Sequence, residues 1–236
     1  MMRALIVDDE LHAREELEAL LEETGEFTLA GKCANALEAL QKIRKEKPDV
    51  VFLDIQMPVV DGFEMIGMID EEHVPIIVFV TAYDQYAIKA FEENAMDYLL
   101  KPVEKERLAK TVQKLKKMVG EGQRTVFAGP EIKRIPCCIS NRIKLVSTAD
   151  VEFVRSDIAG VYVVCSRGEH YTDLTLKVLE SRANFVRCHR QYLVNIDSVD
   201  EIVLHENLAA QIQTKSGRLV PVSRRYLRKL KEKLGI

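Results

Sequence analysis

Short apolar runs alternate with helix-like stretches throughout the first half of this chain. The five runs occupy residues 3–8, 27–33, 49–54, 76–81 and 97–100. Each run is followed by apolar residues at the three- and four-residue spacing of one helix face. Strands that alternate with helices in this way pair in parallel and are covered by helices on both faces of the sheet. The pattern therefore predicts a doubly wound α/β domain with a five-stranded parallel sheet over residues 2–119.

The character of the sequence changes near residue 120. Glycine and proline collect in residues 120–135, which we interpret as a linker. Beyond the linker, residues 136–236 contain many short β-branched runs separated by turn-like segments, and this predicts a mostly β domain. Two helical patches interrupt the β pattern, at 174–182 and at 224–234. A chain of 236 residues is long enough for two domains of this size.

The net charge of −3 conceals a difference between the two halves. Residues 1–123 contain 15 Lys and Arg against 25 Asp and Glu, a balance of −10. Residues 124–236 contain 19 against 12, a balance of +7. A basic domain is suited to polyanions, and nucleic acid is the first candidate. The alternative, an uneven surface composition without functional meaning, is left open by the totals alone.

The composition indicates a soluble globular protein of the cytoplasm. Hydrophobic residues make up 47% of the chain and charged residues 30%. No apolar run approaches the ~18 residues of a membrane-spanning helix. The N-terminus reaches acidic residues after a short apolar run, which argues against a signal peptide. The five cysteines are scattered without a C-x-x-C pair, as expected for reduced thiols.

Polar residues stand where four of the predicted strands end. They are Asp8, Asp9, Asp54, Thr81 and Lys101. Because the carboxyl ends of parallel strands meet at one edge of a sheet, we expect these side chains to lie close together. Three gathered carboxylates repel one another unless a cation is present, and Mg²⁺ takes oxygen ligands from carboxylates and phosphate. A carboxylate can also be the nucleophile that becomes an aspartyl phosphate, with Lys101 and Thr81 facing the phosphoryl oxygens. Each residue alone has an ordinary explanation, but their coincidence at strand ends favours a site.

These residues belong to motifs that resemble the receiver domain of two-component response regulators. The motifs are Val7-Asp8-Asp9-Glu10, Leu53-Asp54-Ile55-Gln56-Met57-Pro58, Asp61-Gly62, Thr81-Ala82 and Lys101-Pro102. The resemblance implies a flavodoxin-like fold and the transfer of a phosphoryl group from a kinase phosphohistidine to Asp54. It also implies a Mg²⁺ site formed by Asp9, Asp54 and the backbone carbonyl of Gln56. In that site Asp8 would assist, and the Lys101–Pro102 peptide bond would be cis.

The same resemblance implies a switch made by Thr81 and Tyr98. A phosphoryl group adds negative charge and strong hydrogen-bond acceptors, which would draw Thr81 inward and let Tyr98 move into the vacated space. The face formed by residues 84–119 is then expected to form a homodimer. The alternative is that Tyr98 is an ordinary aromatic residue at a strand end.

The second half, from about residue 135 to the end, resembles the LytTR family of DNA-binding domains. The matching stretches are FVRCHRQYLVN at 185–195 and PVSRRYL at 221–227. The resemblance implies that loops between strands and the start of the last helix enter successive major grooves. Arg190 and Arg224 are then expected to contact bases or phosphates. In a third contact loop, around residues 160–162, Val161 replaces the usual polar residue.

Four further basic residues are expected to contact DNA phosphates, which position a protein without reading sequence. They are Arg187, Arg225, Arg228 and Lys229. The alternative for the basic residues of 224–234 is the solvated face of an amphipathic helix, and we expect about half of them to contact DNA.

Together these features predict a two-component response regulator that uses Mg²⁺. A sensor histidine kinase, expected in the membrane, would phosphorylate it, and the dimer would bind double-stranded promoter DNA. One rival is an enzyme that turns over phosphorylated substrates. It would need a second acid beside Asp54, and the following run Ile55-Gln56-Met57 provides none. We therefore expect no enzymatic activity beyond phosphoryl transfer to Asp54 and slow self-dephosphorylation. The other rival is an adaptor whose basic half binds protein, RNA or a membrane surface.

Overall fold

The computed structural model of the chain describes residues 1–70, 73–83, 95–120, 131–139, 142–204 and 210–235. The chain divides into two compact units, Met1–Pro130 and Glu131–Ile236. The helix expected between the fourth and fifth runs, over residues 84–94, lies outside the described residues. Within the described ranges, no helix is long and apolar enough to cross a membrane.

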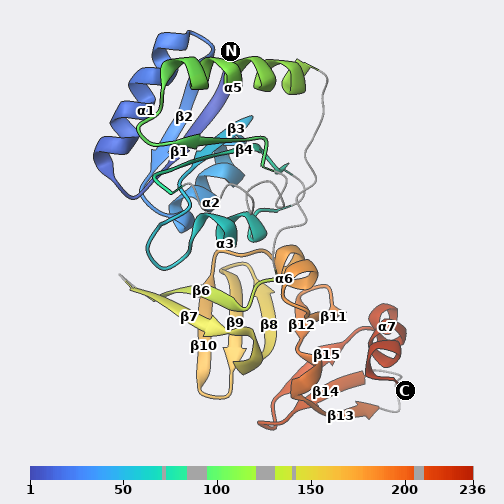
Figure 1. Cartoon of the computed structure of the whole chain (residues 1–236). Coiled ribbons are helices and arrows are strands. Elements are labelled where there is room, and N and C mark those ends of the chain that lie inside the picture. Colours follow the sequence, from blue (N-terminus) through green and yellow to red (C-terminus); the bar gives the residue numbers. More distant parts are fainter. Residues whose placement is uncertain (71–72, 84–94, 121–130, 140–141, 205–209, 236) are drawn as a thin grey trace. The chain divides into compact units, whose positions relative to one another are not determined.

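Five parallel strands form the sheet of the first unit, in the order β2-β1-β3-β4-β5 (Figure 1). The strands are β1 (Met2–Val7), β2 (Phe27–Cys33), β3 (Val50–Leu53), β4 (Ile76–Thr81) and β5 (Asp97–Leu100). The α-helices described with them are α1 (Leu11–Thr24), α2 (Ala36–Glu46), α3 (Gly62–Gly67) and α5 (Lys105–Gly120). Strand order and direction confirm the doubly wound α/β prediction.

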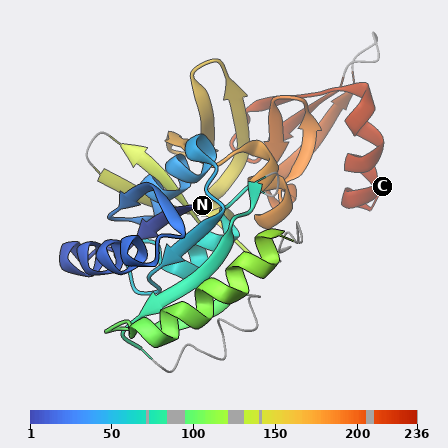
Figure 2. The ribbon, with the colours of Figure 1, turned by 90° about the horizontal axis from the view of Figure 1, so that it is seen from above.

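The central strands of this sheet are apolar on both faces because helices cover both faces. Every residue of β3 and β4 is buried, without the alternation of a sheet that has one face in water. Leu17 of α1 and Leu108 and Leu115 of α5 share one core cluster, so these two helices cover the same face. Figures 1 and 2 show α2 and α3 on the other side of the sheet. Val119 is 40% exposed because it lies at the end of α5.

The second unit is built from two antiparallel sheets, as predicted for a mostly β domain. The seven-stranded sheet has the order β11-β12-β8-β9-β10-β6-β7, and the three-stranded sheet has the order β13-β14-β15. The strands of the first sheet are β6 (Arg134–Ile139), β7 (Arg142–Ser147), β8 (Val151–Asp157), β9 (Gly160–Cys165), β10 (Gly168–Thr172), β11 (Val186–His189) and β12 (Tyr192–Val194). Those of the second are β13 (Val199–Leu204), β14 (Ala210–Thr214) and β15 (Leu219–Val222). The helices are α6 (Leu176–Arg182) and α7 (Arg224–Leu234), with 3₁₀ turns at Thr148–Asp150 and Ile196–Ser198.

The segment expected as a linker, 120–135, ends earlier than the sequence suggested. Ile132 is buried, and its backbone N–H donates to the Arg182 carbonyl at 2.7 Å. Ile135 is fully buried within β6. Residues 131–135 therefore belong to the second unit, because two of their side chains fill its core.

Side-chain contacts join the two sheets and α7 in the second unit. The buried Glu152 carboxylate on β8 accepts hydrogen bonds from the hydroxyls of Thr214 (3.0 Å) and Ser216 (2.6 Å) beside β14. Buried Asn195 donates from its side chain to the Val151 carbonyl at 2.9 Å. These bonds satisfy polar groups that would otherwise be costly to bury. Leu230 of α7 completes the core formed by β11, β12, β14 and β15.

In the first unit a buried carboxylate ties β5 to α5. Asp97 is 9% exposed and accepts hydrogen bonds from Arg107, from Thr111 at 2.8 Å and from Lys114 at 3.2 Å. Arg107 also donates to the Tyr98 carbonyl at 2.9 Å. Burial by itself raises the pKa of Asp97, but the hydrogen bonds from Arg107 and Thr111 outweigh burial and lower this pKa from 3.8 to about 2. The ionised carboxylate therefore stabilises the fold.

Because folding lowers the pKa of Asp97, its contribution to stability is full above pH 3.8 and is lost as the pH falls through about 2. We expect Asp97→Asn to lower the free energy of unfolding of the first unit by about 2 kcal/mol at neutral pH. The difference between the variant and the wild type should shrink as the pH falls below 3.8. Urea unfolding followed by far-UV circular dichroism measures both effects.

The matched control is Glu46→Gln, which removes the exposed Arg3–Glu46 pair at 3.0 Å. It should change the free energy of unfolding by less than about 1 kcal/mol. An Asp97→Asn variant as stable as the wild type at neutral pH would contradict the stabilising role of the Asp97 carboxylate.

Candidate functional site

The carboxyl ends of the central strands hold the polar residues that the sequence singled out. Asp8 follows β1, Asp54 follows β3, Thr81 ends β4 and Lys101 follows β5. Backbone hydrogen bonds continue the sheet ladder at these ends. The Asp54 N–H donates to the Val7 carbonyl at 2.8 Å, and the Lys101 N–H donates to the Thr81 carbonyl at 2.9 Å. The strand ends therefore fix where these side chains begin.

Lys101 brings two of the carboxylates together. Its Nζ lies 2.6 Å from Asp8 Oδ2 and 2.9 Å from Asp54 Oδ2. Asp8 and Asp54 are buried, at 3% and 6% exposure, whereas Asp9 is exposed. Oxygens from Asp8, Asp9 and Asp54 all lie within 4.8 Å of one another. Asp8, Asp9, Asp54 and Lys101 thus lie together at this edge of the sheet, as their places at strand ends predicted.

The pKa values reflect this crowding. Burial raises the pKa of Asp8, although the hydrogen bond from Lys101 acts in the opposite direction. Burial by itself lowers the pKa of Lys101, but its hydrogen bonds to Asp8 and Asp54 outweigh burial and raise this pKa. Lys101 therefore stays charged, and the cluster of three carboxylates has one ammonium beside it, which contacts Asp8 and Asp54. An all-oxygen site with surplus negative charge suits a hard divalent cation.

The loop after Asp54 is shaped by a close approach of two backbone segments. A Cβ on Gly62 would lie 2.5 Å from the Asp54 carbonyl oxygen, so only glycine fits there. Asp61 caps α3 by accepting from the Glu64 N–H at 2.7 Å, and the Glu64 side chain accepts from the Asp61 N–H. These contacts explain why an Asp-Gly pair restarts the chain as a helix.

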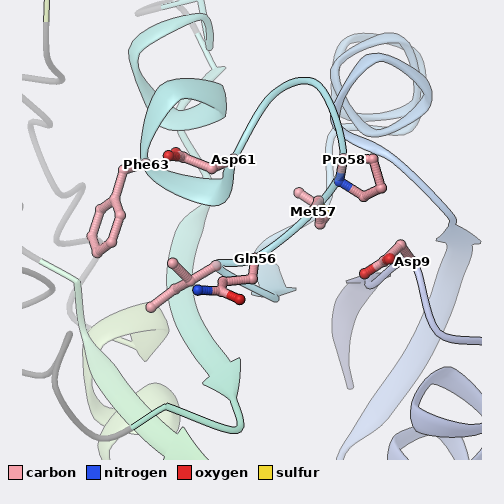
Figure 3. A pocket seen from close by; sticks show the side chains of 7 residues that line it. Asp9, Gln56, Met57, Pro58, Asp61 and Phe63 are labelled. Carbon is pink, nitrogen blue, oxygen red and sulfur yellow. The ribbon is translucent and has the colours of Figure 1, made fainter.

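A pocket of about 440 Å³ opens beside the acidic cluster. Figure 3 shows Asp9 facing the loop that carries Gln56, Met57 and Pro58. The Gln56 N–H donates to Asp54 Oδ1 at 3.3 Å, so this residue turns back over the strand end. Gln56, whose carbonyl was expected as a metal ligand, therefore lies next to Asp54 and on the same pocket as Asp9.

Thr81 is fully buried, and its hydroxyl has no hydrogen-bond partner among the described residues. An unpaired buried hydroxyl costs about 1–3 kcal/mol. A ligand that binds at this edge of the sheet and accepts a hydrogen bond from the Thr81 hydroxyl would remove this cost.

The second predicted switch residue, Tyr98, lies on β5 and is half-buried. Its hydroxyl donates to the backbone carbonyl of Tyr83, two residues after Thr81. The expected cis Lys101–Pro102 bond is present. Of the face expected to form a dimer, residues 84–119, the first eleven lie outside the described residues.

In the second unit the candidate DNA contacts fall on two elements. Arg190 is exposed in the turn between β11 and β12. Arg224 and Arg225 are exposed in the first turn of α7. The N–H of Ser223, the residue before α7, donates to the Cys188 carbonyl at 2.9 Å. The start of α7 is therefore held beside β11, close in sequence to the Arg190 turn (Figure 1).

The other three predicted contacts are ion-paired. Arg228 pairs with Glu232 at 3.0 Å and is 90% exposed, and Lys229 lies 3.5 Å from Glu180 and is 57% exposed. Arg187 differs from both, because its side chain is only 15% exposed and its Nε donates to Glu180 Oε2 at 2.7 Å. Arg187 faces the protein more than the solvent.

Residues 160–162, expected to form a third contact loop, instead begin strand β9. Val161 lies within β9, half-buried and paired with Ser156 of β8. The tip of this hairpin carries Ile158, which is fully exposed. The Ser156 N–H donates to the Gln191 carbonyl at 2.8 Å, so the tip lies next to the turn that carries Arg190. The signal in the sequence was the Ile-Ala-Gly turn, in which Gly160 has a φ of +136°.

Two family models match the chain. The response regulator receiver domain matches residues 4–113, and the LytTr DNA-binding domain matches residues 141–235. The two together cover most of the sequence.

Relatives match the chain over its full length. An uncharacterized response regulatory protein from Vibrio cholerae is 54% identical over 235 residues, covering 100% of this chain and 99% of its own. The transcriptional regulatory protein BtsR from Salmonella typhimurium is 51% identical over 241 residues, covering 100% of both chains. Among solved structures, the response regulatory domain of protein mrkE from Klebsiella pneumoniae is 36% identical, with a TM-score of 0.46. That structure covers 52% of this chain and 100% of its own.

The loop beside Asp54 contains a strained residue that yields a prediction. Val59 has a φ of +74°, and the Val60 N–H donates across it to the Pro58 carbonyl at 2.9 Å. This is a tight γ-turn with a β-branched residue at its centre, a conformation that favours glycine. We expect Val59→Gly to be more stable than Val59→Ala by about 1–2 kcal/mol, because alanine keeps the Cβ that causes the strain.

Thermal or urea unfolding of both variants measures the difference. At an unstrained position the usual order is the reverse, with alanine more stable than glycine. If the alanine variant proved equally or more stable, Val59 would not be strained.

Proposed function

This chain belongs to the response regulators that join a receiver domain to a LytTR DNA-binding domain, and we propose that phosphorylation of Asp54 controls its regulation of transcription. The observation that carries the proposal is the position of Asp54 at a strand end, 2.9 Å from Lys101 and beside two further acids. The donor would be the phosphohistidine of a sensor histidine kinase. This activity belongs in the cytoplasm, where a kinase and promoter DNA are both accessible.

In the proposed reaction a carboxylate oxygen of Asp54 attacks phosphorus. The new O–P bond forms as the N–P bond to the histidine breaks, and the imidazole leaves with the electron pair of that bond. Lys101 lies where it can hold both the attacking carboxylate and the incoming phosphoryl oxygens by charge-assisted hydrogen bonds. The unpaired hydroxyl of Thr81 is a further donor for those oxygens.

The residues present fit the Mg²⁺ ion that the receiver family implies. Asp8, Asp9 and Asp54 offer carboxylate oxygens within 4.8 Å of one another, and the backbone carbonyl of Gln56 would add a fourth oxygen. These are the ligands that Mg²⁺ prefers. When bound, the ion would neutralise carboxylate and phosphoryl charge. The surplus of acids over Lys101 in the described site supports this assignment.

The contacts of Tyr98 suggest how phosphorylation would reach the surface. Thr81 would move towards the phosphoryl oxygens, and Tyr83, two residues on, would move with it. Because the Tyr83 carbonyl accepts the hydrogen bond from Tyr98, that movement would change the position of the tyrosine ring. We propose that this changes the face of residues 84–119 and favours a homodimer.

For the second unit we propose binding to double-stranded promoter DNA. Arg190 and Arg224 would contact bases or phosphates from two neighbouring elements. Arg225, Arg228 and Lys229 would contact phosphates, which supply most of the affinity. Ile158, at the exposed tip beside Arg190, could contact a thymine methyl group but cannot read a base by hydrogen bonding. Pairing two such units in a dimer would raise the effective affinity without any new contact.

Asp54→Asn should abolish labelling of the chain by acetyl phosphate and Mg²⁺, because an amide cannot act as the nucleophile. Intact-mass measurement of the added phosphoryl group is the readout, and size-exclusion chromatography with light scattering should show no phosphorylation-dependent dimer. The control is Asp61→Asn, which lies on the same loop and keeps its helix cap, since Asn caps as well as Asp. Undiminished labelling of Asp54→Asn would assign the nucleophile to another residue.

Arg190→Ala should weaken binding to a preferred duplex by roughly tenfold to a hundredfold and relax sequence preference. Arg228→Ala should weaken binding to all duplexes about equally. It should also reduce the slope of log affinity against log salt concentration by about one. The duplex would be selected from random DNA with the full chain, and affinities measured at several salt concentrations. Lys133→Ala, which removes an exposed charge outside the matched residues 141–235, is the control. Equal weakening of selected and random duplexes by Arg190→Ala would count against base reading.

A further inference from the structure

The turn that carries Arg190 is fixed by several contacts that do not involve the Arg190 side chain. The Gln191 N–H donates to His189 Nδ1 at 3.2 Å, and the Gln191 carbonyl accepts from the Ser156 N–H at 2.8 Å. The strand pairing shifts register between Arg187 and His189, so a bulge precedes the turn. A bulge re-aims the residues that follow it, and its geometry has to be held by neighbouring groups.

Arg187 holds the remaining side of this turn. Its Nη1 donates to the Arg190 backbone carbonyl at 3.2 Å, while its Nε donates to Glu180 Oε2 at 2.7 Å. One planar guanidinium therefore joins the turn to helix α6. Since Glu180 neutralises Arg187 and the arginine side chain is only 15% exposed, little of its charge is available to a phosphate.

The Glu180 carboxylate also lies near α7, the second element that is proposed to contact DNA. Glu180 Oε1 lies 3.5 Å from Lys229 Nζ on α7, and the Ser223 N–H holds the start of α7 to the Cys188 carbonyl. The Lys229 contact is long and exposed, so we assign it little energy. It nevertheless places Glu180 between the turn that carries Arg190 and the helix that begins with Arg224.

We propose that Glu180, acting through Arg187, positions Arg190 for sequence-specific DNA binding, and that neither Glu180 nor Arg187 contacts DNA. A reading arginine gains affinity only when its backbone is already held in the binding geometry, since otherwise binding must order the turn. The contact between Glu180 and Arg187 holds the turn in this geometry before DNA binds. This inference deepens the proposed function and rests on Arg190 being a DNA contact.

Arg187→Lys separates positioning from phosphate contact. Lysine keeps the positive charge and serves as well as arginine at a phosphate, but its ammonium cannot reproduce the fork that joins Glu180 to the Arg190 carbonyl. We expect binding of the full chain to the selected duplex to weaken by about tenfold, with binding to a scrambled duplex of equal length and its salt dependence unchanged. A direct phosphate contact predicts near wild-type binding to both duplexes.

Glu180→Ala gives the second readout. It removes a negative charge, so a purely electrostatic role predicts tighter binding to every duplex. Positioning predicts weaker binding to the selected duplex. The matched control is Glu232→Ala, which removes a carboxylate from α7 that pairs with Arg228 and not with Arg187. It should leave the ratio of selected to scrambled binding unchanged. Far-UV circular dichroism and thermal unfolding of each variant check that the domain is folded.

A double-mutant cycle links the pair to Arg190. In an Arg190→Ala background, Glu180→Ala should cause no further loss of sequence preference. If Arg190→Ala abolishes preference while folded Arg187→Lys and Glu180→Ala variants retain it, the positioning role is wrong and the proposed function stands. If Arg190→Ala retains the preference, or the wild type prefers no duplex, the proposed DNA contact fails and the positioning role fails with it.

Discussion

The site of the receiver domain depends on one ammonium group held between two buried carboxylates. Lys101 contacts Asp8 and Asp54 within 3 Å, and neither acid is accessible enough for water to screen their mutual repulsion. The three residues follow β1, β3 and β5, so the parallel sheet holds the two carboxylates close together in spite of their repulsion. A phosphoryl group would raise the charge at Asp54 to about −1.5 to −2 and disturb this balance. Under the proposed phosphorylation, the arrangement that destabilises the unphosphorylated fold would also make it respond to the added charge.

The DNA-binding unit uses its basic residues in two different ways. The Arg187 side chain is largely buried, paired with Glu180 and hydrogen-bonded to the backbone, whereas Arg190 is exposed in the turn between β11 and β12. A charge that is paired and buried orients its neighbours, whereas an exposed charge, even one in a weak surface pair, is available to a polyanion. The 19 basic residues of 124–236 therefore include residues such as Arg187, whose charge is neutralised within the unit.

Much of the fold and the receiver site could be predicted because buried parallel strands leave an unmistakable apolar pattern. The residues at strand ends followed from that pattern, since parallel strands must finish at one edge. The position of residues 131–135 and the hairpin tip at Ile158 could not be predicted, because short strands in antiparallel sheets have boundaries that depend on their neighbours. Val161 was misplaced for this reason: pairing with β8 draws it into a strand.

The sequence by itself determined which chemical groups are present, where the strands of the receiver lie, and that Asp54 ends one of them. Periodicity and composition are local properties, so they can be read along the chain. Only the tertiary structure decided which charges meet. It placed Lys101 on two acids 47 and 93 residues away, left the Thr81 hydroxyl without a partner among the described residues, and paired Arg187 with Glu180. Electrostatic interactions act through space and depend on burial, and neither distance nor burial is written in the order of residues.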